Sequence, residues 1–195
     1  MTHARQFGHW RACVFFDCRR FDQGTGIMIK TEPVMDVART TSSSTAVQIA
    51  EHPFMKGLSA EQITRLSACA MDSHFAAGEI IFLEGDPANR FYLIQAGRVA
   101  LESRPSGSEA VVIGEIGPGD VLGWSWLLPP YLWHFDARAI EPVSAIFLYG
   151  TRLREECEED HDLGYELMKR TAEVIIQRLQ STRQRLQAAL SRAKG

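Results

Sequence analysis

Residues 77–123 consist of short apolar runs, each interrupted by a Gly-Asp or Ala-Gly pair. The three segments are AGEIIFLEGD, FYLIQAGRVAL and IGPGDVLG. Glycine accepts the positive φ angle that tight turns require, and aspartate hydrogen-bonds its own backbone there. Short strands with turn signals about 8–12 residues apart are typical of an antiparallel barrel or roll. This pattern therefore predicts such a fold for the centre of the chain.

The order of these turns resembles that of the cyclic-nucleotide-binding domain, the β-roll of catabolite-activator-like regulators and of kinase regulatory subunits. The residues that carry the resemblance are Gly78-Glu79, Glu84-Gly85-Asp86, Tyr92-Leu93-Ile94, Gly97, Gly117-Pro118-Gly119-Asp120 and Gly123. The resemblance covers residues 52–190. It implies a mainly β fold with helices: a double-stranded β-helix, or jelly-roll-like β-roll, with an N-terminal helix and a long C-terminal dimerisation helix.

Composition suggests one domain with tails, because the chain has 195 residues and 45% of them are hydrophobic. We expect residues 1–46 to form a disordered or mis-assigned extension, which ends in the linker-like run TTSSST at 40–45. Translation would then start at Met28 or Met35. Residues 47–150 are expected to form the β-roll, and residues 151–195 the C-terminal helices.

The cysteines indicate a cytoplasmic protein with reduced thiols, because the four are scattered without a C-x-x-C pair. An iron–sulfur sensor is the alternative, but only Cys13 and Cys18 lie close together in the sequence. No apolar run approaches the ~18 residues of a membrane span. A net charge of −3 predicts no binding of nucleic acid through the field of the whole molecule.

Two helices flank the predicted roll. The first begins with a capping box, in which Ser59 is the N-cap and Gln62 follows three residues later. The second carries a heptad pattern over residues 162–190, through which we expect a homodimer. Packing of this helix against the roll is the alternative. The residues of the heptad seam are Met168, Ala172, Ile175, Leu179, Thr182, Leu186 and Ala189.

The phosphate-binding cassette of the family is altered in this chain. In the family it runs Gly-Glu, a short helix whose N–H groups face the phosphate, then Pro-Arg-[Ser/Thr/Ala]-Ala. Its arginine neutralises the phosphate and its glutamate binds the ribose hydroxyl. With Arg138 and Ala139 aligned to the following strand, Trp124 takes the place of the glutamate and Trp133 that of the arginine. We therefore expect weak or absent binding of cyclic AMP.

Three readings of this cassette remain open. Its aromatic side chains could fill the pocket, since each buries about 150–250 Å². The pocket could instead bind a less anionic ligand: a planar aromatic, a lipid-like molecule, or haem with His134 or His161 as axial ligand. A nucleotide could still bind through backbone N–H groups and polar side chains. The cofactor is thus left unknown, and the candidate ligand-binding residues are Gly123, Trp124, Ser125, Trp126, Trp133, His134, Phe135, Arg138, Thr182 and Arg183.

The last two candidates come from a second resemblance, that of RLQSTR at 178–183 to the activator's R-L-Q-x-T-x segment. It implies that Thr182 contacts the base and that Arg183 faces across the dimer. The alternative is that Thr182 only sets the register of the helix seam.

The sequence predicts a regulatory output rather than catalysis. It shows no nucleophile–base set, metal-ligand cluster or phosphate loop, so we expect no enzyme activity. The chain ends at Gly195 without a recognition helix, so we expect no direct contact with nucleic acid. The predicted function is a ligand-sensing module without its own DNA-binding domain, which acts on an unknown downstream protein. The alternative is a ligand-free protein-interaction dimer with a self-filled pocket.

Overall fold

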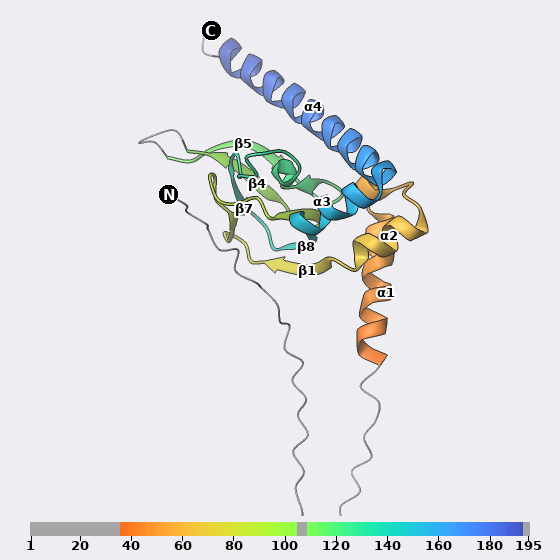
Figure 1. The fold of residues 1–195 in the computed structure, drawn as a ribbon. Helices are drawn as coiled ribbons and strands as arrows, with labels where there is room; N and C mark the ends of the chain where they lie inside the picture. Colours follow the sequence, from red (N-terminus) through yellow and green to blue (C-terminus); the bar gives the residue numbers. More distant parts are fainter. Residues whose placement is uncertain (1–35, 105–108, 193–195) are drawn as a thin grey trace, which may run out of the picture. The chain divides into compact units, whose positions relative to one another are not determined.

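Two antiparallel sheets form the centre of the computed structural model, which describes residues 36–104 and 109–192, with side chains from residue 44 onward (Figure 1). The first sheet has the strand order β1-β8-β3-β6 and the second the order β2-β7-β4-β5. The mainly β, jelly-roll-like prediction is confirmed. The strands are β1 (Ala70–Phe75), β2 (Ile80–Phe82), β3 (Arg90–Ala96), β4 (Val99–Ser103), β5 (Val111–Ile116), β6 (Val121–Leu122), β7 (Asp136–Ala139) and β8 (Val143–Tyr149).

The predicted turn glycines have the backbone conformation that glycine favours. Gly97, which joins β3 to β4, has a φ of 82°. A Cβ atom at Gly97 would lie 2.1 Å from the carbonyl oxygen of Pro142. Any other residue at this turn would therefore force the β3–β4 and β7–β8 connections apart.

The central strands β3 and β8 of the first sheet are buried on both faces, so that a hydrophobic core lies on each side of them. Along β3, Phe91 and Leu93 face the helices, whereas Tyr92 and Ile94 face the second sheet. Side chains of a strand alternate between its faces, so four consecutive buried residues require a layer on each side. The helix-side layer contains α1 (Asp36–Glu51), η1 (Pro53–Met55), α2 (Ala60–Ser67), α3 (Gly150–Glu159) and α4 (His161–Arg192).

At its N-terminal end the structure differs from the predicted linker. Residues 40–45 lie within α1, a helix that already begins at Asp36. Thr45 and Ile49 of this helix are buried in the helix-side layer. Packing of an apolar face outweighs the modest helix propensity of serine and threonine. The predictions for Cys13, Cys18 and the start at Met28 or Met35 lie outside the described residues.

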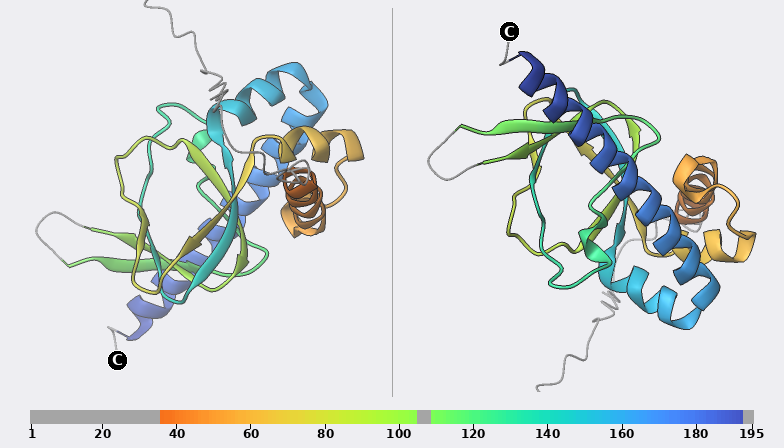
Figure 2. Two further views of the ribbon diagram at one scale, coloured as in Figure 1. Left: turned by 90° about the horizontal axis from the view of Figure 1, so that it is seen from below. Right: turned by 90° about the horizontal axis from the view of Figure 1, so that it is seen from above.

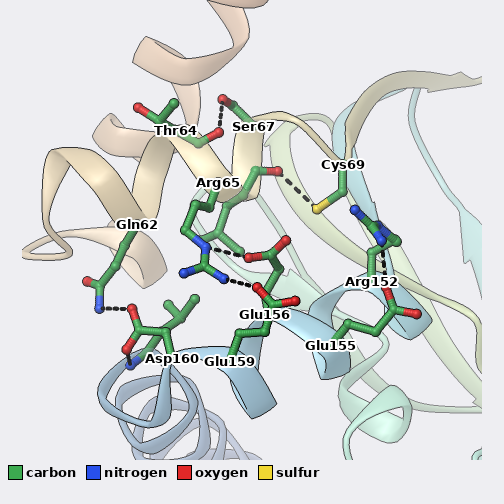
Figure 3. A network of polar contacts seen from close by, with 12 residues as sticks. Gln62, Thr64, Arg65, Ser67, Cys69, Arg152, Glu155, Glu156, Glu159 and Asp160 are labelled. Carbon is green, nitrogen blue, oxygen red and sulfur yellow. Dashed lines mark hydrogen bonds and ion pairs between the residues drawn. The ribbon is translucent and has the colours of Figure 1, made fainter.

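The predicted capping box is present at the start of α2. The Ser59 Oγ accepts from the backbone N–H of Gln62 at 3.1 Å, and the Gln62 Oε1 accepts from the backbone N–H of Ser59 at 3.0 Å. Arg65, one turn further along α2, points toward the junction of α3 and α4 (Figure 3). Its guanidinium forms ion pairs of 2.6 Å with Glu156 and 2.7 Å with Glu159.

Asp160 completes this network between the helices. Its carboxylate accepts from the side chain of Gln62 at 3.1 Å and from the backbone N–H of Leu163 at 3.0 Å. The second bond satisfies an N–H group of the first turn of α4. Both hydrogen bonds lower the pKa of Asp160, and the bond from Leu163 has the larger effect. The network thereby fixes the direction in which α4 leaves α3.

From this junction, α4 crosses one face of the roll diagonally toward β5 (Figure 2). Its first turns are anchored, because Leu163, Leu167 and Thr171 are buried. Beyond Arg178 its residues are exposed. The long C-terminal helix is confirmed, and it brings residues of its second half opposite β4 and β5 of the roll.

Candidate functional site

A cavity of about 340 Å³ lies between the roll and α4. Surveyed ligand pockets measure about 300–1,000 Å³, so this one suits a small ligand. On the side of the roll it is lined by Leu101, Ile113, Gly114, Glu115, Ile116, Trp124 and Phe135. On the side of α4 it is lined by Ile175, Arg178, Leu179, Ser181, Thr182 and Arg185.

Trp133 occupies the interior of the roll next to this cavity. Only 4% of its surface is exposed, and its ring stacks on that of Phe82 at 4.0 Å and an interplanar angle of 13°. Gly123 makes room for the ring, because a Cβ atom there would lie 2.8 Å from the Trp133 indole. Gly123 also has a φ of 91°, which favours glycine. At this point, aromatic side chains fill the inside of the roll.

Trp124 behaves differently from Trp133, although both belong to the same cassette. It is half-buried at the edge of the cavity, on the 3-10 turn η2 (Trp124–Trp126). Its indole ring lies 5.7 Å from the exposed ring of His134. The Nε1–H of Trp124 is buried and has no acceptor among the described residues. A buried donor of this kind costs free energy unless a ligand or water accepts from it.

Arg178 reaches the cavity from α4. Its Nη2 donates to the backbone oxygen of Val121, whereas its buried Nη1 has no acceptor among the described residues. Burial lowers the pKa of Arg178, and the carboxylate of Asp120 opposes that shift. This residue was not among the predicted site residues. The available signal was its spacing from Thr182, since residues four apart share a helix face.

The remaining predicted residues are distributed over three places. Phe135 and Thr182 line the cavity, as Trp124 does. Ser125 and Trp126 are buried, and Trp126 contacts Phe91 in the helix-side layer, with ring centroids 5.8 Å apart. His134 and Arg183 are exposed and do not line the cavity.

For Arg138 the structure differs from the assignment as a ligand residue. It lies on β7, away from the cavity lining. Its Nε donates to both carboxylate oxygens of Glu102, at 3.2 and 3.3 Å, and its Nη1 donates to the backbone oxygen of Gly78 at 3.1 Å. The guanidinium of Arg138 is therefore already engaged with a buried carboxylate.

The predicted heptad seam lies only partly on the cavity. Its residues Ile175, Leu179 and Thr182 line the cavity, whereas Met168 and Leu186 do not and are exposed to 54% and 59%. The exposed apolar residues form what we call the outer stripe of α4: Tyr165, Met168, Ile176, Leu179, Leu186 and Leu190.

The described part of the chain offers little support for the metal-based alternatives. Within residues 36–104 and 109–192, no three His, Cys, Asp or Glu side chains are grouped so that they could hold a metal. His134 and His161 are both exposed. Cys69 and Cys157 are free thiols whose pKa is raised to about 11, chiefly by burial. In the same part of the chain, no helix is long and apolar enough to cross a membrane.

Comparison with known proteins identifies the family. Residues 72–160 match the family model of the cyclic nucleotide-binding domain. A solved structure described as a cyclic nucleotide-binding protein, from Geobacter metallireducens, is 30% identical, with a TM-score of 0.63. The similarity covers 69% of this chain and 98% of that one. The chain therefore belongs to the cyclic nucleotide-binding domain family, a family of regulatory domains.

Two further relatives are regulatory proteins. A CRP-like cAMP-activated global transcriptional regulator of Mycobacterium tuberculosis is 24% identical over 138 residues, which are 71% of this chain. The match spans only 60% of the length of that regulator. The regulatory subunit of a cAMP-independent protein kinase A from Trypanosoma brucei shares the fold, with a TM-score of 0.59 and 22% identity over 70% of this chain and 49% of that one.

Proposed function

We propose that this chain is a ligand-sensing regulatory module that binds a small molecule other than cyclic AMP between its roll and α4. The observation that carries the proposal is the cavity of about 340 Å³ bordered by Trp124 and Arg178. Both side chains have a buried donor without an acceptor among the described residues. The proposed action is regulatory, in the cytoplasm and through a downstream protein, rather than catalytic.

The altered cassette argues against cyclic AMP as that ligand. Trp124 and Trp133 stand where the family resemblance implies the ribose-binding glutamate and the phosphate-binding arginine. Loss of a hydrogen bond to a charged group costs about 1.5–3 kcal/mol. Two such losses weaken binding by about a hundredfold or more. Trp133 and Phe82 also fill the interior of the roll, so that a phosphate there would have to displace a stacked ring pair.

The outer stripe of α4 supports a homodimer. Its six members are 53–67% exposed, and their spacing along the chain places them on one side of the helix. A contiguous exposed apolar surface of this kind is typical of an interaction site. A second copy of the chain would cover the stripe with an identical one, as two-fold symmetry requires.

A ligand-free interaction dimer is the second candidate. The stacked pair of Trp133 and Phe82 favours it, because these rings already occupy part of the space that a ligand would take. In this case the outer stripe of α4 would be the functional surface, and the cavity beside Trp124 would hold only water.

Thermal denaturation with a ligand panel separates the two candidates. The panel contains cyclic AMP, cyclic GMP, adenosine and aromatic acids. A ligand at 100 times its Kd stabilises the folded state by about 2.7 kcal/mol, which is a shift of several degrees for a domain of this size. The variant Gly114→Leu fills the cavity: a Cβ at Gly114 lies at an ordinary 3.5 Å from Leu101. A shift with a compound other than cyclic AMP that this variant abolishes supports the sensor, whereas a shift with cyclic AMP contradicts the proposed ligand. No shift with any compound supports the interaction dimer.

A further inference from the structure

The cavity between the roll and α4 has hydrogen-bond donors that lack acceptors. Trp124 and Arg178 line it from different elements, η2 and α4, and each side chain carries a buried donor without an acceptor among the described residues, Nε1 in Trp124 and Nη1 in Arg178. Native structures leave few buried polar groups unpaired, and such groups indicate an absent ligand or water. Two unpaired donors on residues that line one cavity therefore favour an occupant with acceptor oxygens.

The charge of the lining favours an anion. Arg178 and Arg185 line the cavity, and Arg185 already donates to the backbone oxygen of Ile113 at 3.3 Å. The lining contains one carboxylate, that of Glu115, which is exposed and lies 3.8 Å from Arg98. Outside the lining, Asp120 lies near Arg178, but one of its carboxylate oxygens accepts from the backbone N–H of Gly117 at 2.8 Å.

The rest of the lining is apolar and suits a ligand with a planar aromatic ring system. It consists of two aromatic rings and five aliphatic side chains: Trp124, Phe135, Leu101, Ile113, Ile116, Ile175 and Leu179. The stacked rings of Trp133 and Phe82 are buried and occupy part of the interior of the roll.

We infer that this cavity binds a planar aromatic monocarboxylate, whose oxygens accept from the Nε1 of Trp124 and the Nη1 of Arg178. The inference rests on the proposed sensor function and names the ligand class of the same cavity. In this arrangement the anion is bound by a side chain of α4, whereas the family's cassette binds the phosphate within the roll. Binding of the acid therefore reports directly on the position of α4 relative to the roll.

A matched pair of probes tests the inference by calorimetry on the full chain. Indole-3-acetate carries the carboxylate, and indole-3-acetamide has the same shape without the charge. A charged acceptor strengthens hydrogen bonds about twofold over a neutral one. We expect indole-3-acetate to bind at least about tenfold more tightly than the amide. Equal affinity of the two probes, or no binding of the acid, overturns the inference.

Two variants locate the contacts. Trp124→Phe keeps an aromatic side chain and removes the Nε1–H together with part of the ring surface, and Arg178→Gln removes the charge. Each is expected to weaken binding of indole-3-acetate by about tenfold and to reduce its preference over the amide. Arg192→Gln, at the exposed end of the same helix, is the control and leaves affinity unchanged. Because Arg178→Gln also loses the contact with Val121, Trp124→Phe provides an independent test should Arg178→Gln unfold.

The outcomes distinguish failure of this inference from failure of the proposed function. If adenosine or cyclic GMP binds, Gly114→Leu abolishes that binding and the acid does not bind, then the inference is wrong and the sensor function stands. If neither the acid, the amide nor any nucleotide binds, both are wrong. Tight binding of the acid that Trp124→Phe and Arg178→Gln leave unchanged also overturns the inference, since it places the ligand elsewhere.

Discussion

Replacing Trp133 by alanine should destabilise the roll strongly. The side chain is 4% exposed and stacks on Phe82 at 4.0 Å, so its removal leaves an apolar void between the sheets. Buried tryptophan-to-alanine substitutions cost about 3–5 kcal/mol, because transfer free energy and contacts around the void are both lost. For a unit of this size, such a loss lowers the Tm by about 6–20 °C.

Trp124→Ala is the matched control, since it removes the same side chain from the same cassette. Trp124 is only half-buried and borders a cavity that already exists. A half-buried indole contributes about 2 kcal/mol from its area. Its unpaired Nε1–H disappears with it, which offsets part of that loss. We therefore expect less than half the destabilisation caused by Trp133→Ala.

Urea denaturation followed by circular dichroism measures both variants without dependence on indole fluorescence. Added indole should raise the stability of Trp133→Ala by occupying the new void, since apolar voids of this size stay dry and accept apolar ligands. Indole should stabilise Trp124→Ala less, because that site opens to solvent. Equal losses of unfolding free energy in the two variants would refute the assignment of Trp133 to the interior of the roll and of Trp124 to the cavity edge.

Three further predictions concern other parts of the molecule. Arg65→Met removes ion pairs with Glu156 and Glu159, and should lower the Tm roughly twofold more than Arg152→Met, whose single ion pair is exposed. Burial lowers the pKa of His52 below 6.5, so the unfolded chain takes up the proton first. Stability is therefore complete above pH 6.5 and falls, by up to about 1.4 kcal/mol per pH unit, as the pH drops through the lowered pKa; His52→Gln should flatten this dependence in urea titrations. Leu186→Glu should weaken the affinity of the proposed dimer about a hundredfold or more, as measured by sedimentation. The substitution acts twice, because a two-fold interface contains Leu186 from both copies. Gln184→Glu adds the same charge on another face of α4 and should leave the dimer intact.

Each of these predictions has a result that would contradict it. Similar Tm values for Arg65→Met and Arg152→Met would mean that the two ion pairs of Arg65 stabilise the fold no more than the exposed pair of Arg152. Stability of the natural chain that is constant between pH 5 and pH 7 would show that His52 titrates freely. A monomer at all concentrations would leave the outer stripe of α4 without the proposed partner.

The features that follow from the sequence alone depend on short-range chemistry. The turn at Gly97 and the capping box of Ser59 and Gln62 each involve only a few consecutive residues, and both are present as predicted. The order of such turns along residues 77–123 was sufficient to predict the roll. The resemblance likewise predicts, from the sequence, that Trp124 and Trp133 take the places of the cassette's ionic residues.

Only the tertiary structure determined where those side chains lie. Trp124, Trp126 and Trp133 fall within ten consecutive residues, yet they occupy the cavity edge, the helix-side layer and the interior of the roll. Arg178 became a site residue through a bond to Val121, 57 residues earlier in the chain. The polar run at 40–45 became helical because α1 packs Ile49 into a core shared with distant segments. Local patterns describe which backbone a segment favours, whereas burial, partners and unpaired donors depend on contacts between segments that the sequence does not place side by side.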